Sequence, residues 1–201
     1  MSTTHNHINR PIHLARRDAF FERAMELLYL PLQEMDTPTR ISHLHQVMDL
    51  LATARQHAFF ASLSSRACTR ETDFLRFLEL IHDNADSMHS MMEHQTHLEA
   101  AESFLCQFLH TTREQCQQPA MQYRRRAEDL MNGLWQLLRL SHRPYRELQK
   151  EFSESAGAEE SIRYNKAYES FRQESQSRYP GPEWNGQERG MANLESAEKP
   201  V

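Results

Sequence analysis

Glycine is scarce in this 201-residue chain, which contains only five. Four of them, Gly157, Gly181, Gly186 and Gly190, follow residue 156, so Gly133 is the single glycine of the preceding sequence. Tight β-turns depend on glycine because its backbone readily adopts a positive φ. The chain is instead rich in Leu, Gln, Glu, Arg and Ala, which favour helices. This composition argues against a β-sheet architecture and predicts an all-α fold.

Cysteine is also scarce, and the three present are Cys68, Cys106 and Cys116. An odd number without a Cys-x-x-Cys pair argues against a disulfide framework and favours a reducing compartment. The longest apolar runs fall well short of the roughly 20 residues that a membrane span needs. The first residues, "MSTTHNHINRP", lack the apolar core of a secretory signal. We therefore expect a cytoplasmic protein without a membrane span, and export without a signal peptide is the alternative.

Lysine is rare as well, and the formal net charge of the chain is -5. Such a balance is not typical of a protein built to bind polyanions. The stretch "YRRRAEDL" nevertheless places Arg124, Arg125 and Arg126 together, and three arginines can contact nucleic-acid phosphates. Glu128 and Asp129 follow at spacings suited to ion pairs within one helix. We expect a solvated or salt-bridged surface here, and a helical nucleic-acid-binding regulator is the least favoured of three functional hypotheses.

Apolar residues recur every three or four positions through most of the chain, which predicts amphipathic helices. Prolines and polar stretches divide the pattern into segments, and we expect Pro119 to open the fourth segment and Pro144 to end it. The expected helices cover approximately residues 11–30, 37–63, 69–110, 119–143 and 159–177, with a short helical piece to about residue 152. The predicted fold is a bundle of four to five amphipathic helices over residues 11–176. We expect residues 1–10 to be flexible and residues 177–201 to form a disordered tail.

The segment 72–110 is either one helix or two. "HDNADS" is poor in helix-forming residues, and Ser90 with Glu93 resembles a capping box, so both features favour a break. The apolar stripe, however, keeps its phase from Phe74 to Leu98. We therefore expect one long or kinked helix.

Histidines and acidic residues are concentrated in this same segment. On a continuous helix, six of them fall within an arc of about 80°: Glu79, His82, Asp86, His89, Glu93 and His97. The candidate ligands for a metal ion are Glu79, His82, His89, Glu93 and His97. Di-metal sites in helical bundles use two Glu-x-x-His elements, whereas this chain has one. We expect the stripe to be a solvated helix face. A metal- or cofactor-binding helical protein is the second functional hypothesis, and no particular cofactor is implied.

Several residues are candidates for contact with a protein partner. Met88, Met91 and Met92 form an adaptable apolar cluster, although methionines at helical spacing more often belong to a core. Trp135 could anchor a partner at a helix edge or pack in the core. Trp184 stands in "PEWNG" within the expected tail, where it could form a short docking motif or be a chance feature.

No catalytic pattern is present in the sequence. It lacks G-x-S-x-G, a P-loop, a dinucleotide fingerprint and a recognisable Cys/His pair, which argues against an enzyme without excluding one. Our leading hypothesis is a non-enzymatic helical module for protein–protein interaction, such as an adaptor, chaperone, regulator or delivered effector. The broad apolar helix faces also favour a homo-oligomer.

Overall fold

The computed structural model describes residues 3–63, 69–109 and 113–182, and all regular structure within these ranges is helical. The prediction of an all-α bundle of four to five helices is confirmed. The elements in chain order are α1 (Thr3–Leu28), the short 3-10 helix η1 (Leu32–Glu34), α2 (Thr37–Leu63), α3 (Thr69–Leu109), α4 (Arg113–Ser155) and α5 (Ala158–Arg178).

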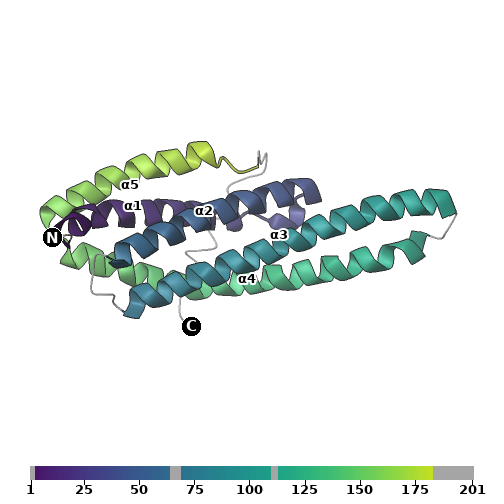
Figure 1. Ribbon diagram of the computed structural model, residues 1–201, viewed down its shortest axis with the longest axis horizontal. Coiled ribbons are helices and arrows are strands. Elements are labelled where there is room, and N and C mark those ends of the chain that lie inside the picture. Colours follow the sequence, from purple (N-terminus) through teal and green to yellow (C-terminus); the bar gives the residue numbers. More distant parts are fainter. Residues whose placement is uncertain (1–2, 64–68, 110–112, 183–201) are drawn as a thin grey trace, which may run out of the picture.

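Successive long helices run in opposite directions, so that α1, α3 and α5 are parallel to one another and antiparallel to α2 and α4 (Figure 1). α1 packs between α2 and α5, and α3 packs against both α2 and α4. α4 also touches α1, because the rings of Phe21 and Tyr145 meet edge to face with centroids 4.9 Å apart. The first four helices therefore form a closed bundle, and α5 is added to the outer side of α1.

A single apolar stripe on α3 organises the bundle. Its members alternate at spacings of four and three residues, and each is at most 2% exposed: Phe74, Leu78, Ile81, Ala85, Met88 and Met92. This is the heptad spacing with which antiparallel helices pack side by side. The prediction of one long helix is confirmed, since α3 runs unbroken from Thr69 to Leu109. "HDNADS" remains helical because Ile81 and Ala85 keep the stripe in phase on either side of it.

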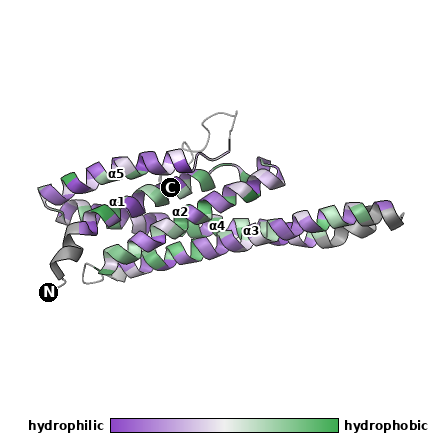
Figure 2. Ribbon diagram, turned by 45° about the horizontal axis from the view of Figure 1, so that its top comes forward, coloured by the Kyte–Doolittle hydropathy of each residue, from purple (hydrophilic) through white to green (hydrophobic). Residues whose placement is uncertain are grey.

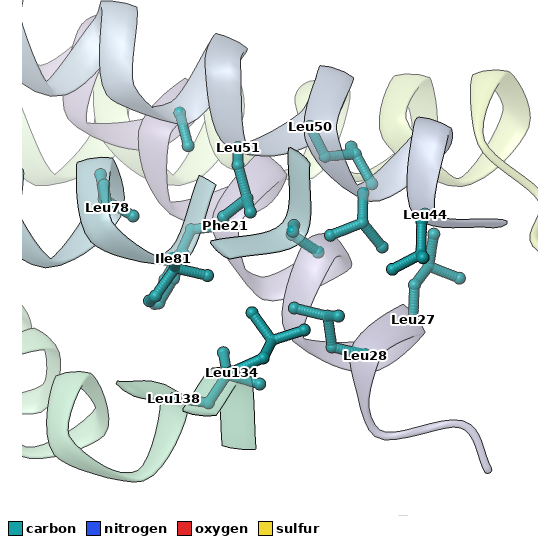
Figure 3. Close-up of a cluster of buried hydrophobic side chains, with 14 of the residues drawn as sticks. Phe21, Leu27, Leu28, Leu44, Leu50, Leu51, Leu78, Ile81, Leu134 and Leu138 are labelled. Atoms are coloured by element: carbon teal, nitrogen blue, oxygen red, sulfur yellow. The ribbon is translucent and has the colours of Figure 1, made fainter. Parts of the chain in front are cut away.

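Figure 3 shows how the side chains of the first four helices meet in one interior. Phe21 of α1 is fully buried and meets the ring of Phe74 edge to face at 5.1 Å. Leu51 of α2 and Leu134 of α4 approach the same interior from the two neighbouring helices. Aromatic rings and branched aliphatic side chains thus fill the centre of the bundle, and their burial is its main source of stability.

Gly133 lies where α3 and α4 approach each other closely. A Cβ atom at this position would lie 3.3 Å from Oδ1 of Asn84, closer than most side-chain contacts. The amide of Asn84 also donates a hydrogen bond to the carbonyl of Leu130. The single glycine of the first 156 residues therefore allows a polar contact between the two longest helices.

Pro144 does not end α4, and this prediction is wrong. The helix continues to Ser155, and buried residues continue at spacings of three and four across the proline: Leu138, Ser141, Tyr145 and Leu148. A proline inside a helix costs about 3 kcal/mol. Burial of a large apolar side chain contributes about 1.5–3 kcal/mol, so the two large side chains after Pro144 outweigh this cost.

Two helices begin earlier than their prolines indicated. α1 starts at Thr3 rather than Pro11, and α4 starts at Arg113 rather than Pro119. Pro11 is buried inside α1, so its ring contributes to packing instead of marking a first turn. The predicted fifth helix is confirmed, whereas residues 183–201, most of the expected tail, lie outside the described residues.

Replacing Phe21 by Ala tests the packing of this core. We expect the free energy of unfolding to fall by about 3–5 kcal/mol, because the change leaves a cavity between three helices. Phe59→Ala is the matched control, since Phe59 is 49% exposed, and its effect should stay below about 1 kcal/mol. Urea unfolding followed by circular dichroism measures both changes, and similar losses for the two variants would contradict this account.

Candidate functional site

The histidines of α3 flank the apolar stripe. His82 and His89 each follow a stripe residue, and their side chains are only 21% and 13% exposed. His97 is exposed, as are Glu79 and Glu93. The expectation of a solvated face therefore holds for His97 and is wrong for His82 and His89, because positions beside a heptad core are partly covered by the neighbouring helix.

One of these histidines meets a histidine of α2. The rings of His45 and His89 lie with centroids 5.6 Å apart, and Nδ1 of His89 is 3.9 Å from a carboxylate oxygen of Glu93. Nevertheless, the described part of the chain contains no group of three or more His, Cys, Asp or Glu side chains arranged to hold a metal ion. Metal binding by the stripe stays a prediction, without converged ligands in this structure.

The predicted partner-binding residues are divided among different environments. Met88 and Met92 are 1% and 2% exposed and belong to the core, while Met91 is half-buried beside it. Trp135 is also half-buried, with its ring 5.1 Å from that of Tyr29, the residue that follows α1. Trp184 lies outside the described residues. The methionine cluster and Trp135 therefore do not form one exposed surface.

The three arginines at the start of the predicted fourth helix lie on the surface of α4. Arg124, Arg125 and Arg126 are all exposed, and Nε of Arg124 lies 3.5 Å from a carboxylate oxygen of Glu128. This i,i+4 contact is the intrahelical pairing that the sequence indicated. Binding of these arginines to phosphates stays a prediction.

A buried ion pair lies on α1 in a place where the sequence analysis found no site. Nε of Arg17 is 2.6 Å from Oδ1 of Asp18, and the two side chains are 4% and 2% exposed. Burial raises the pKa of the Asp18 carboxyl, although the attraction of Arg17 opposes this shift. The guanidinium of Arg17 also lies over the ring of Phe74 at 5.5 Å.

Three tyrosines extend this pair into a network across α1, α4 and α5. Tyr164 donates a hydrogen bond to Oδ2 of Asp18 at 2.7 Å, and Tyr168 donates one to Oε2 of Glu22. Tyr145 donates to the other oxygen of Glu22 at 2.7 Å. Burial, together with the nearby carboxylates, raises the pKa of all three phenols, so the hydroxyls stay protonated as donors.

The network holds α5 on α1 with little apolar burial. Ser175 is the buried residue of α5, whereas its aromatic residues are only partly buried. Arg16 of α1 lies between the rings of Phe20 and Phe171, at 5.1 and 4.9 Å, and forms an ion pair with Glu174 at 2.9 Å. The polar contacts therefore carry much of the specificity of α5 docking. A sequence signal existed, since Asp18 interrupts the apolar face of "ARRDAFFERA".

Two further histidines face each other between α1 and α2. Nδ1 of His13 is 2.9 Å from Nδ1 of His57, a contact in which one ring donates and the other accepts. Burial lowers the pKa of His13, and burial together with nearby Arg16 lowers that of His57 to about 4. His43, buried in α2, contacts the carbonyl of Leu27 at 2.7 Å, and burial lowers its pKa as well.

The paired ends of α3 and α4 extend beyond the other helices (Figures 1 and 2). We call residues 93–109 of α3 and 113–124 of α4 the arm. It begins where Arg40, in the first turn of α2, contacts Sδ of Met92 at 3.8 Å. From this level on, the positions that continue the heptad spacing of the stripe are polar: Gln95 is buried, Glu102 is half-buried and Glu99 is exposed.

Large apolar side chains are nevertheless exposed on the arm. Phe104 of α3 is 68% exposed and Met121 of α4 is 51% exposed. The two helices are held together by their own contacts, such as the stacking of His94 on Tyr123 with centroids 5.7 Å apart. The arm therefore presents side chains of both helices at its surface.

Comparison of the chain with models of known protein families, with curated proteins and with solved structures finds no match. Among the described helices, none has both the length and the apolar character required to cross a lipid bilayer. The candidate sites are thus defined by the geometry of this chain alone.

Arg17→Met tests the buried pair, because it leaves the Asp18 carboxylate buried without its cation. We expect the free energy of unfolding to fall by about 3–5 kcal/mol. The exposed Arg124–Glu128 pair provides the control, and Arg124→Met should cost less than about 1 kcal/mol. Chemical denaturation at pH 7 measures both, and an unchanged stability in Arg17→Met would show that the pair is dispensable.

The histidine pair predicts how stability depends on pH. The folded-state pKa of His57 lies below its ordinary value of about 6.5, so the folded protein binds fewer protons than the unfolded chain in this range. This contribution to stability is present above pH 6.5 and is lost as the pH falls from 6.5 towards 4.

His57→Gln should reduce the loss of stability over this interval, whereas replacement of the exposed His97 by Gln should not. Comparing each variant with the unaltered protein cancels the opposing contribution of the Asp18 carboxyl, whose pKa is raised. Thermal unfolding at half-unit pH steps gives the comparison. Equal pH dependence in the unaltered protein and His57→Gln would remove His57 as the cause.

Proposed function

We propose that this chain is a non-enzymatic module for protein–protein interaction that binds a partner through the arm of α3 and α4. The observation that carries the proposal is the extension of the arm beyond α1, α2 and α5 (Figure 1). At 1.5 Å per residue, the 17 residues of α3 in the arm span about 25 Å.

The arm contributes little to the core of the bundle. The apolar stripe of α3 is complete at Met92, before the arm begins, and Gln95, Glu99 and Glu102 continue it with polar residues. Ordering these residues costs conformational entropy that the bundle core does not offset. A role outside the bundle explains why two long helices continue past the point where the other helices end.

The exposed side chains of the arm suit a protein partner. Phe104 and Met121 offer an aromatic ring and a flexible thioether, the kinds of side chain enriched at the centre of interfaces. Exposed charged groups, including Glu93 and Arg124, lie at the base of the arm. Apolar contacts with a polar rim are typical of reversible interfaces.

A photo-cross-linking amino acid at position 104 tests the proposal in cells that express the protein naturally. The matched control is the same amino acid at Ile162 on α5, because Phe104 and Ile162 are both 68% exposed. We expect a discrete protein adduct from position 104 that is absent from position 162.

Competition adds a second requirement to this experiment. Excess unlabelled protein should abolish the adduct, while excess Phe104→Glu/Met121→Glu protein should not, because its arm no longer offers the apolar contact. Equal labelling from positions 104 and 162, no adduct at all, or equal competition by the two proteins would contradict binding through the arm.

A further inference from the structure

Exposed positions of α3 and α4 include two lines of opposite charge. Between residues 77 and 112 the sequence contains no Lys or Arg, and three acidic residues are repeated every seven positions on α3: Glu79, Asp86 and Glu93. All three are exposed. Seven residues are two helical turns, so these side chains form one line along the helix, which we call the acidic row.

A matching line lies on α4. Arg125, Asn132 and Arg139 are also spaced by seven residues, are also exposed, and are continued by Arg146. We call these four residues the basic row. The stacking of His94 on Tyr123 shows how the antiparallel helices align, and it places Glu93 near the level of Arg125 and Glu79 near the level of Arg139. The two rows therefore have the same spacing over the same part of the molecule.

These charges form few contacts within the bundle, although Arg139 lies near enough to Tyr29 to oppose the rise that burial causes in the pKa of its phenol. Among the described residues, Glu79, Asp86, Arg125 and Arg139 take part in no ion pair. Glu93 contacts only the half-buried His89, at 3.9 Å. The acidic row and the basic row of one chain are thus both open to charged groups of another molecule.

Exposed leucines accompany the rows. Leu80, next to Glu79, is 44% exposed, and Leu140, next to Arg139, is 60% exposed. The antiparallel alignment of α3 and α4 brings both leucines to a similar level of the hairpin. An apolar contact between charged rows is the arrangement that gives an interface both affinity and a fixed register.

We propose that the α3–α4 hairpin binds the same hairpin of a second copy of this chain, with the acidic row of each copy against the basic row of the other. A two-fold axis parallel to the helices makes both contacts at once, because it places α3 of each copy opposite α4 of the other and keeps the rows at the same level. Leu80 and Leu140 of both copies lie at the centre of this interface. The proposal goes beyond the proposed function, because the rows and leucines lie mainly on the part of the hairpin outside the arm.

The charge complementarity selects a second copy over an unrelated partner. A partner that matched this surface would need a basic row and an acidic row with seven-residue spacing on two neighbouring helices, and this chain itself has that pattern. The contact is electrostatic in part, so it should weaken as salt screens the exposed charges.

Two charge-reversed variants of the full-length protein test the proposal. The first is Glu79→Arg/Glu93→Arg, and the second is Arg125→Glu/Arg139→Glu. Sedimentation equilibrium from about 1 to 100 µM, a range that covers the affinities of reversible interfaces, should show a dimer of the unaltered protein that dissociates more at 0.5 M than at 0.05 M salt. Each variant alone should remain a monomer, because each then presents like charges to its own copy.

An equimolar mixture of the two variants should form a heterodimer, since the reversed rows are complementary to each other. Restoration in the mixture also shows that both variants are folded. The control Glu160→Arg/Glu169→Arg makes the same change of charge on exposed positions of α5 and should leave the dimer intact.

A monomeric unaltered protein at 100 µM and low salt would overturn the proposal, as would dimers of either variant alone or a mixture that stays monomeric. These results would not affect cross-linking of an outside protein at position 104. Loss of that cross-link together with a salt-sensitive dimer would instead overturn binding through the arm and leave the dimer in place.

Discussion

The apolar stripe of α3 is the constraint on which the rest of the fold depends. Its residues from Phe74 to Met92 contact helices on both sides, so one unbroken heptad pattern fixes the direction and height of α2 and α4. The close approach at Gly133 and the ring contacts of Phe21 and Tyr145 follow from that alignment. Even the polar stretch "HDNADS" remains helical, because packing of the stripe outweighs its poor local propensity.

The attachment of α5 depends on a different kind of interaction. Asp18 and Glu22 would be costly to bury alone, but the hydroxyls of Tyr164 and Tyr168 satisfy them from α5. Such a network adds little net stability compared with apolar packing. Its hydrogen bonds, however, can form only when α5 lies in one position on α1. The bundle and its fifth helix are therefore held by apolar packing and by hydrogen bonding, respectively.

Much of the fold could be predicted from the sequence because helical periodicity is a local property. The scarcity of glycine, the stripe from Phe74 and the extent of α5 all led to correct conclusions. Proline was the weak indicator, since its cost is local while the burial of Tyr145 and Leu148 is not. Whether a helix continues through Pro144 depends on contacts with residues more than 60 positions away.

The candidate sites were harder to predict for the same reason. Asp18 and Glu22 meet tyrosines more than 120 positions away in the sequence, and His57 meets His13 across 44 positions. A pattern within one helix, such as the stripe from Glu79 to His97, does not show which residues of a neighbouring helix lie opposite it. The coverage of His82 and His89 could have been anticipated, however, because both residues follow members of the buried stripe.

Beyond Met92, polar residues continue the spacing of the apolar stripe of α3, and this change separates the arm from the core. If α1 or α2 also packed along α3 beyond Met92, apolar residues would be needed at the next positions of the stripe. Gln95, Glu99 and Glu102 stand there instead, although the helix itself continues to Leu109. The residues that extend α3 and α4 into the arm are thus different from those that form the core. Extension of the hairpin is a property that the bundle does not require, and under our proposal the exposed Phe104 and Met121 use that extension to bind a partner.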